Sequence, residues 1–279
     1  MKKKNKFKFG NFIIHISLIL YSVITLAPLI TVFSSSFRTI GNQASHLKLF
    51  MEFSLESYKA AFTKMDYPVV FLNSFLTTAG SLVVIVMIGA AAAYPIGRLK
   101  TKLSRFLYYF FIAGLVIPAQ MVIIPVAQMF NSLNIPYTRF TPMFMFITCS
   151  MPFTTFLYSG FMKGVPVEIE EAAYMDGANL FKRFTQIVFP LLKPATVAVV
   201  ITQGIWIWND YFFPMVFITK SGQFSLPVAM IQFLGDRENP AQWNVLFASC
   251  FLCALPLITL FLIFQKQFVN GVAAGAVKG

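Results

Sequence analysis

Few residues of this 279-residue chain could do chemistry, and they do not form a catalytic set. The two histidines lie far apart, and the sequence contains no HExxH, no G-x-S-x-G and no paired Cys/His spacing for a metal. It also lacks G-x-x-x-x-G-K-S/T, the Walker pattern whose backbone amides bind the phosphates of ATP. We therefore expect a protein that is not an enzyme and that holds no metal or cofactor of its own.

The stretch from Pro166 to Pro190, PVEIEEAAYMDGANLFKRFTQIVFP, is the only long polar insertion between apolar segments. Pro166 suits the first position of a helix, where its missing N–H is not needed. Negative charge then lies near the positive end of the helix dipole, on Glu168, Glu170 and Glu171. Asp176-Gly177 indicates a turn, because glycine tolerates positive φ, and a second helix is expected from Asn179 towards Pro190. The pattern predicts a short, rigid helix–turn–helix that another protein could grip.

A second group of polar residues lies in an apolar segment. At 100° per residue Gln203, Trp206 and Asp210 share one helical face, while Trp208 points away. An aromatic ring beside hydrogen-bonding groups suits a sugar, which has apolar C–H faces and many hydroxyls. The candidate residues of a solute path are Gln203, Trp206, Asn209, Asp210 and Gln120. Alternatively the tryptophans anchor the helix at the membrane interface and Asp210 bonds to a neighbouring helix; for Trp208 we favour that alternative.

The elements that must position these residues are transmembrane helices. The chain is 57% hydrophobic and 11% charged, with a mean hydropathy of +0.72, which is typical of a polytopic membrane protein. Small residues from Gly89 to Ala93 favour close helix packing, and the third span contains Pro118 and Pro125. We expect an all-α single domain over 1–279 with a core of 70–265, a polar loop at 163–194 and a short tail at 266–279. The six spans are expected at 12–33, 70–97, 106–130, 141–162, 195–217 and 244–265.

The distribution of basic residues predicts the orientation. With the N-terminus inside, the inner segments carry 15 of the Lys and Arg residues and the outer loops carry 7. Both termini and the 163–194 loop are therefore predicted to lie in the cytosol. The same distribution explains the net charge of +12 without a nucleic-acid partner.

An ion-coupled carrier is one alternative, because such carriers keep ionisable groups near the middle of the membrane. Asp210 is the single acidic residue in the six expected spans. It follows Ala195 by 15 residues, which is roughly 22 Å along a helix and places it towards the outer third. The sequence therefore gives this mechanism little support. A membrane scaffold without transport activity is a further alternative.

Glu171-Ala172-Ala173, followed by Gly177 and a hydrophobic stretch that ends at Pro190, resembles the EAA loop of ABC importer permeases. The resemblance continues through MPFTTFLYSGFMKGVPVEIEEAAYMDGA, FPLLKP and WNDYFFP to the ending FQKQFVNGVAAGAVKG. These segments are similar to the sugar branch of that family, the maltose-type second permease subunit. The similarity covers most of residues 70–279, and we call residues 163–194 the EAA loop.

The resemblance implies a type I ABC importer permease fold and an EAA loop that docks in a cleft of a separate cytosolic ATPase. Glu171 would make the charged contact, Ala172 and Ala173 would allow close approach, Asp176 and Gly177 would form the turn, and Pro190 would start the return helix. The alternative is an amphipathic linker on the membrane surface. Such a linker would have a cleaner apolar face and would not need Ala-Ala-x-x-Asp-Gly.

The same resemblance implies the partners and the location. The chain would be a multi-pass protein of a bacterial-type plasma membrane, paired with a second, non-identical permease subunit. Two ATPase subunits carrying ATP and Mg²⁺, an extracellular solute-binding protein and a sugar or oligosaccharide substrate would complete the system. The mechanism would be alternating access around a central cavity. A non-sugar solute is the alternative within this class.

The orientation can be tested by cysteine labelling in a cysteine-free background. Single cysteines at Ser45 and Gln223 should react with an impermeant thiol reagent added outside the cell, because both positions lie in predicted outer loops. A cysteine at Asn179, in the EAA loop, should stay unlabelled in intact cells. Labelling of Asn179→Cys under those conditions would contradict both the orientation and the cytosolic docking.

Overall fold

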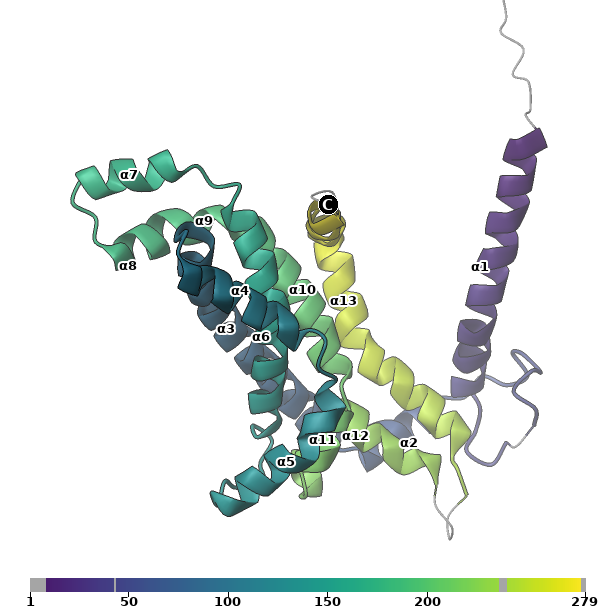
Figure 1. Ribbon diagram of the computed structural model, residues 1–279. Helices are drawn as coiled ribbons and strands as arrows, with labels where there is room; N and C mark the ends of the chain where they lie inside the picture. Colours follow the sequence, from purple (N-terminus) through teal and green to yellow (C-terminus); the bar gives the residue numbers. More distant parts are fainter. Residues whose placement is uncertain (1–8, 43, 236–239, 277–279) are drawn as a thin grey trace, which may run out of the picture. The chain divides into compact units, whose positions relative to one another are not determined.

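The structure, a computed structural model, describes residues 9–42, 44–235 and 240–276, and every regular element within these ranges is helical (Figure 1). Contacts group the chain into two compact units, residues 1–67 with 230–255 and residues 68–229 with 256–279. The single domain expected over 1–279 therefore stays a prediction. The lysines of residues 2–8, on which the predicted orientation partly depends, lie outside the described residues.

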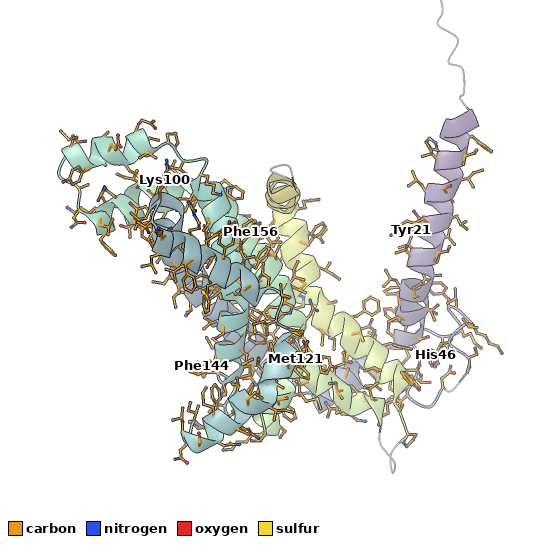
Figure 2. The ribbon with its side chains drawn as sticks, viewed as in Figure 1. Tyr21, His46, Lys100, Met121, Phe144 and Phe156 are labelled. Atoms are coloured by element: carbon orange, nitrogen blue, oxygen red, sulfur yellow. The ribbon has the colours of Figure 1, made fainter. Side chains whose placement is uncertain are left out.

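The first unit contains α1 (Phe9–Ser36), α2 (Glu56–Lys64), η3 (Gln232–Leu234) and the beginning of α13 (Trp243–Ala276). Apolar side chains project from all around α1, and Tyr21 is 69% exposed (Figure 2). The polar segment expected as a loop between the first two spans contains α2. Another difference is that α13 continues to Ala276 beyond a kink at Phe264, so most of the expected tail is helical.

A buried arginine organises the segment that follows α1. The Arg38 side chain is fully buried, and its guanidinium donates to the carbonyl oxygens of Ala44 at 2.8 Å, Ser45 at 3.2 Å and Lys48. The Asn244 side-chain amide donates to the Thr39 and Asn42 carbonyl oxygens, both at 2.9 Å. A buried cation needs such acceptors, because burial without them is costly. The segment therefore wraps around this side chain.

The second unit contains most of the helices. In chain order they are α3 (Tyr67–Arg98), α4 (Lys102–Gly114), α5 (Ala119–Ser132), α6 (Pro142–Met162), α7 (Val167–Met175), α8 (Leu180–Lys182), the π-helix η1 (Arg183–Val188), α9 (Phe189–Leu191), α10 (Lys193–Asn209), α11 (Phe212–Phe217), η2 (Ser221–Gln223) and α12 (Leu226–Ile231), with the last part of α13. α12 crosses the boundary between the two units.

Among the described residues, four helices are long and apolar enough to cross a membrane. They cover residues 12–36, 67–98, 142–162 and 243–265, close to four of the expected spans. The third expected span is instead a pair of helices, α4 and α5, bent by 98° at their break. The segment 180–191 and α10 form a second bent pair, at 72°. The chain reaches the expected six spans only if each bent pair counts as one.

Local chemistry explains the two breaks inside expected spans. Pro118 has an extended ψ of 122° and precedes α5, and proline also disfavours the helical conformation of the residue before it. The fifth expected span, 195–217, breaks after Asn209 because Asp210 has a ψ of 126°. The Asp210 carboxylate accepts a hydrogen bond from the Phe213 backbone N–H at 2.9 Å. An aspartate at this position caps the next helix, α11.

Small residues let α3 pack closely on α6 at three points. A Cβ atom added to Gly80, Gly89 or Gly97 would lie 2.8, 2.3 or 2.8 Å from the nearest side-chain atom of α6. These α6 partners are Met143, Thr154 and Met162. Small residues let helix backbones approach closely when no hydrophobic effect drives them together in lipid. The expected role of Gly89 in helix packing is confirmed.

We predict that Gly89→Ala destabilises the protein. The new Cβ would lie 2.3 Å from Cγ2 of Thr154, whose short, branched side chain is fully buried and cannot swing away. Overpacking of this kind costs about 1–3 kcal/mol, more than the roughly 0.5–1 kcal/mol that alanine gains over glycine in a helix. Thermal unfolding in detergent should show a lower Tm.

Gly160→Ala is the matched control, since nothing lies within 4 Å of the new Cβ on α6. It should leave the Tm unchanged or raise it. The Gly89→Ala/Thr154→Ser pair, which removes Cγ2, should recover most of the loss. Equal Tm values for Gly89→Ala and Gly160→Ala would refute the packing argument.

Candidate functional site

The first arm of the EAA loop is helix α7. It begins at Val167, so Pro166 is the residue before the helix and not its first residue, one position from the expectation. Pro166 has an extended ψ of 135°. Proline has no backbone N–H, and none is needed at this entry to the helix. Glu168 and Glu170 lie in the first turn of α7, where the positive end of the helix dipole stabilises their negative charge.

The turn after α7 is built on Gly177, as the sequence predicts. Gly177 has a φ of +79°, a left-handed conformation that glycine adopts without steric cost. The Gly177 N–H donates to the Tyr174 carbonyl at 3.0 Å, and the Ala178 N–H donates to the Ala173 carbonyl at 2.9 Å. This pair of hydrogen bonds is the Schellman motif, which ends a helix and satisfies its last carbonyl groups.

The return arm is helical but irregular. Asn179 caps α8 by accepting from the Lys182 N–H at 2.9 Å, as expected for a helix that begins near it. A six-residue π-helix, η1, then precedes Pro190. Its wider turn relieves the clash between the proline ring and the preceding turn. Pro190 was expected to start the return helix, but it lies inside α9, and α10 begins at Lys193 after the bend.

The outer surface of the loop is apolar and carries charged side chains, both acidic and basic (Lys182). Glu171, Ala172 and Asp176 are exposed, and Ala173 is half-buried. Large apolar side chains are exposed near the turn, with exposed fractions of 83% for Met175, 74% for Phe181, 63% for Tyr174 and 60% for Leu180. The Arg183 guanidinium lies 5.1 Å from the centre of the Tyr174 ring and joins the two arms. The loop therefore presents an apolar surface with exposed carboxylates on Glu168, Glu171 and Asp176.

The inner surface of the loop holds a buried ion pair that the sequence analysis did not anticipate. The Glu170 carboxylate accepts from Arg98 Nε at 2.6 Å and lies 2.5 Å from a terminal guanidinium nitrogen of the same arginine. The Tyr94 hydroxyl donates to its other oxygen at 2.8 Å. Side-chain exposure is 13% for Arg98 and 7% for Glu170. Removing one member of such a pair costs roughly 3–5 kcal/mol, because the other charge stays buried.

A sequence signal for this pair exists in retrospect. Glu170 and Glu171 are neighbours, so on a helix their side chains point about 100° apart and cannot both face one partner. Arg98 is a basic residue at the end of the second span, where it complements the negative end of the α3 dipole. The pair thus joins two helix ends of opposite sign.

The candidate solute-path residues are only partly brought together. The Gln203 amide oxygen accepts from the Ser150 hydroxyl of α6 at 2.8 Å. Trp206 is 36% exposed and contacts Phe146 and Phe213 edge-on, at ring-centre distances of 5.6 and 6.2 Å. Asp210 does not continue their helical face, because α10 ends at Asn209 and the carboxylate caps α11. Of the three residues, only Gln203 and Trp206 therefore remain on this candidate face.

The other two candidates lie on different helices, α10 and α5. Asn209 is exposed, and its side-chain amide donates to the Ile205 carbonyl at 2.8 Å. Gln120 is exposed in the first turn of α5. Within the described part of the chain, neither side chain is hydrogen-bonded to Gln203 or Trp206.

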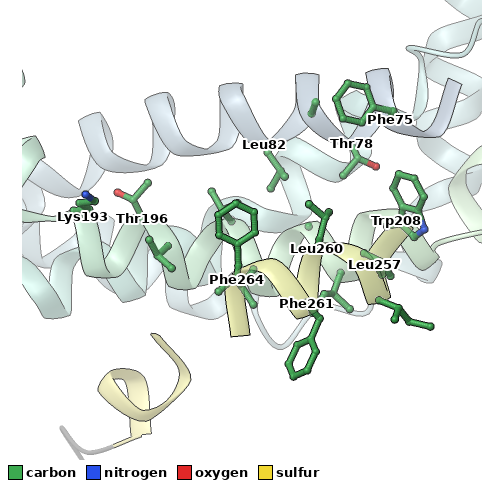
Figure 3. A pocket seen from close by; sticks show the side chains of 17 residues that line it. Phe75, Thr78, Leu82, Lys193, Thr196, Trp208, Leu257, Leu260, Phe261 and Phe264 are labelled. Carbon is green, nitrogen blue, oxygen red and sulfur yellow. The ribbon is translucent and has the colours of Figure 1, made fainter. Parts of the chain in front are cut away.

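Trp208 is not the interfacial anchor that we favoured. It is only 6% exposed and packs edge-on against Phe71 of α3, at 6.0 Å between ring centres. Figure 3 shows it at one end of an apolar groove of about 770 Å³, with Lys193 towards the other end. α3, α10 and the last part of α13 line this groove. A tryptophan whose ring is enclosed in this way stabilises the packing of α10.

Comparison with known proteins assigns the family. The family described as "Binding-protein-dependent transport system inner membrane component" matches residues 85–273, which include the whole EAA loop and α10. The chain belongs to this family. Its span over more than half of the chain is consistent with the multi-pass arrangement of apolar helices.

Three relatives of this transport system component resemble it along most of their length. The melibiose/raffinose/stachyose import permease protein MelC of Bacillus subtilis is 33% identical, over 90% of this chain and 91% of its own. The probable starch degradation products transport system permease protein AmyC of Thermoanaerobacterium thermosulfurigenes is 31% identical, over 93% and 94%. The multiple sugar-binding transport system permease protein MsmG of Streptococcus mutans is 30% identical, over 100% of both chains.

A solved structure shows the same fold. A chain of a bacterial ABC transporter involved in the import of the acidic polysaccharide alginate superposes with a TM-score of 0.80. The match covers 96% of this chain and 99% of the other, at 19% sequence identity. The inner membrane component described here therefore has the fold of an ABC transporter permease.

Proposed function

We propose that this chain is a transmembrane permease subunit of an ATP-driven, binding-protein-dependent importer of sugars or oligosaccharides. The observation that carries the proposal is the EAA loop, a rigid hairpin with an exposed apolar and acidic surface in a chain of this family. The names of the three relatives, which refer to sugars or to starch products, support carbohydrate as the substrate class. The chain itself would form half of the path through the membrane.

In this proposal the EAA loop docks in a cleft of a separate cytosolic ATPase. Glu171 would make the charged contact, and Ala172 and Ala173 would let the partner approach closely. The Schellman turn at Asp176 and Gly177 would fix the angle between the two arms. Pro190 would help to hold the return arm. Docking of this kind suits the exposed apolar residues near the turn, which water would otherwise surround.

The proposed assembly contains a second, non-identical permease subunit, two ATPase subunits and an extracellular solute-binding protein. ATP and Mg²⁺ would be bound by the ATPase and not by this chain. Both termini and the EAA loop would lie in the cytosol of a bacterial-type cell. Closure of the ATPase would move the loop, and the helices would reorient around a central cavity in alternating access.

An ion-coupled mechanism has little support. The Asp210 carboxylate is used to cap α11 through the Phe213 N–H, which is a structural task. A non-sugar solute would leave the rest of the proposal unchanged, and uptake measurements with labelled sugars distinguish the two cases.

Docking of the ATPase can be tested at two residues of the EAA loop. Gly177→Val should strain the positive-φ turn, and Ala173→Trp should block close approach of the partner. Both variants should lose the ATPase on co-purification and should lose uptake, while the permease still reaches the membrane. Gly177→Asn is the control for the turn, because asparagine tolerates this conformation better than valine. Normal co-purification and normal uptake with both Gly177→Val and Ala173→Trp would show that the loop is a mere linker.

The solute path can be tested at α10. Gln203→Ala and Trp206→Ala should reduce sugar uptake or change which sugars pass, since a sugar needs both the aromatic face and the hydrogen-bonding amide. Stimulation of the ATPase by the loaded binding protein should persist, because the EAA loop is unchanged. Labelled-sugar uptake in vesicles, with ATPase activity measured in parallel, gives both values.

The control for the solute path must avoid Trp208, whose removal would open a cavity in the packing of α10. Ile205→Ala is suitable, because Ile205 is 41% exposed and lines the apolar groove of Figure 3. Its uptake should stay near that of the unchanged protein. If Ile205→Ala fails while Gln203→Ala and Trp206→Ala transport normally, the solute passes along a different face.

A further inference from the structure

We propose that the buried Arg98–Glu170 ion pair transmits movement of the docked EAA loop to the packed pair of helices α3 and α6. The inference rests on the proposed docking of the loop to an ATPase and adds the residues that carry the motion into the membrane. Neither residue belongs to the proposed substrate face. Both are positioning residues, which act by fixing the loop to the helices.

The first observation is the number of elements that one guanidinium joins. Arg98 is the last residue of α3, and besides Glu170 of α7 it donates to the carbonyl oxygen of Met162, the last residue of α6, at 3.2 Å. The Tyr94 ring, one turn earlier, lies 5.3 Å from the ring of Phe184 on the return arm. The end of α3 therefore contacts both arms of the loop and the end of α6. The loop cannot move relative to either helix without breaking these contacts.

The second observation is electrostatic. Arg98 lies at the negative C-terminal end of α3, and its contact with Met162 adds the negative end of α6. Glu170 lies in the first turn of α7, at the positive end of that helix. Each charge is thus favoured by its own helix as well as by its partner. Because the pair is mostly withdrawn from water, solvent weakens it little.

The third observation is the rigid connection beyond the pair. The three glycines of α3 lie against side chains of α6 at three points, so the two helices are closely packed. On α6, the Ser150 hydroxyl donates to Gln203 of α10. Hydrogen-bonded and packed contacts therefore run without a gap from Glu170, through Arg98 and the α3–α6 pair, to the candidate solute face. Coupling between distant sites is carried by contiguous contacts of this kind.

Adjacent glutamates would then have separate tasks. Glu171 is exposed and available to the ATPase, whereas Glu170 is buried against Arg98 and Tyr94. This separation makes an experiment possible. Changes at Glu170 and Arg98 leave the outer, docking surface of α7 intact, so loss of transmission can be distinguished from loss of docking.

The decisive variant is Arg98→Gln/Glu170→Gln. Either single change leaves a buried charge without its partner and is expected to lower the abundance of the protein. The double change removes both charges, and the two amides, which are uncharged, can still form hydrogen bonds, so most of the abundance should recover. The complete transporter, with its ATPase and binding protein, is reconstituted in vesicles. Four quantities are measured: abundance, co-purified ATPase, ATP hydrolysis stimulated by sugar-loaded binding protein, and sugar taken up per ATP hydrolysed.

We expect the double variant to hold the ATPase at the unchanged level and to lose about tenfold in sugar taken up per ATP, a magnitude typical of coupling between sites. The matched control is Lys100→Gln/Glu168→Gln. It removes the same two charges close to the same two helix ends, from side chains that are exposed (Lys100 is labelled in Figure 2). Its ratio of uptake to hydrolysis should not change.

The outcomes separate the two proposals. If the double variant binds the ATPase and its ratio of uptake to hydrolysis is normal, the ion pair only stabilises the fold and the inference is wrong. If sugar uptake per ATP falls equally in the double variant and in the matched control, the fall is caused by the loss of charge near the membrane and not by the loss of the ion pair, and the inference is wrong. If Gly177→Val and Ala173→Trp keep the ATPase, docking itself is wrong, whatever the ion pair does.

Discussion

The constraint on which this structure depends is that backbone polar groups inside a membrane must find partners within the protein. Long helices meet it automatically, so α3 and α6 run unbroken through their apolar segments. Where a helix stops within an apolar segment, local groups take over. The break before α5 is closed by hydrogen bonds from the Leu115 and Val116 N–H groups to carbonyls three residues earlier, and the break before α11 by the Asp210 carboxylate. The acidic residue near the end of this span thus accepts a hydrogen bond from a backbone N–H, and only a carboxylate oxygen not used in this way could bind a solute.

This constraint decides what the sequence could predict. The length of the apolar segment predicted the span at 70–97, which is observed as 67–98. The residues of the turn predicted the left-handed conformation of Gly177. The bends could not be predicted, because proline inside a span is compatible with either a kink or a complete break. The environment of Trp208 could not be predicted either. A helix that is hydrophobic all round does not reveal which face is enclosed by protein and which meets lipid.

The buried ion pair escaped sequence reasoning for a different reason. Glu170 and Arg98 are 72 residues apart, and no local pattern links them. The EAA pattern draws attention to Glu171, the exposed neighbour, whereas the carboxylate that ties the loop to the membrane helices precedes it. Long-range pairs between helix ends depend on how α3, α6 and α7 are placed together. That placement follows from packing by small residues, which composition indicates without specifying the partners.

Packing and charge have complementary tasks in this arrangement. Glycine contacts between α3 and α6 are short-ranged and hold the two helices together at three points, but they do not fix the loop outside the apolar segment. The Arg98–Glu170 pair acts at that boundary, where water is partly excluded and an arginine can contact a carboxylate and a helix-end carbonyl at once. A lysine could supply the charge but not the same set of planar contacts. A loop that must be held firmly by the membrane helices and stay accessible to the proposed ATPase therefore needs a buried carboxylate on one side of α7 and an exposed one on the other. Two consecutive glutamates on a helix provide both.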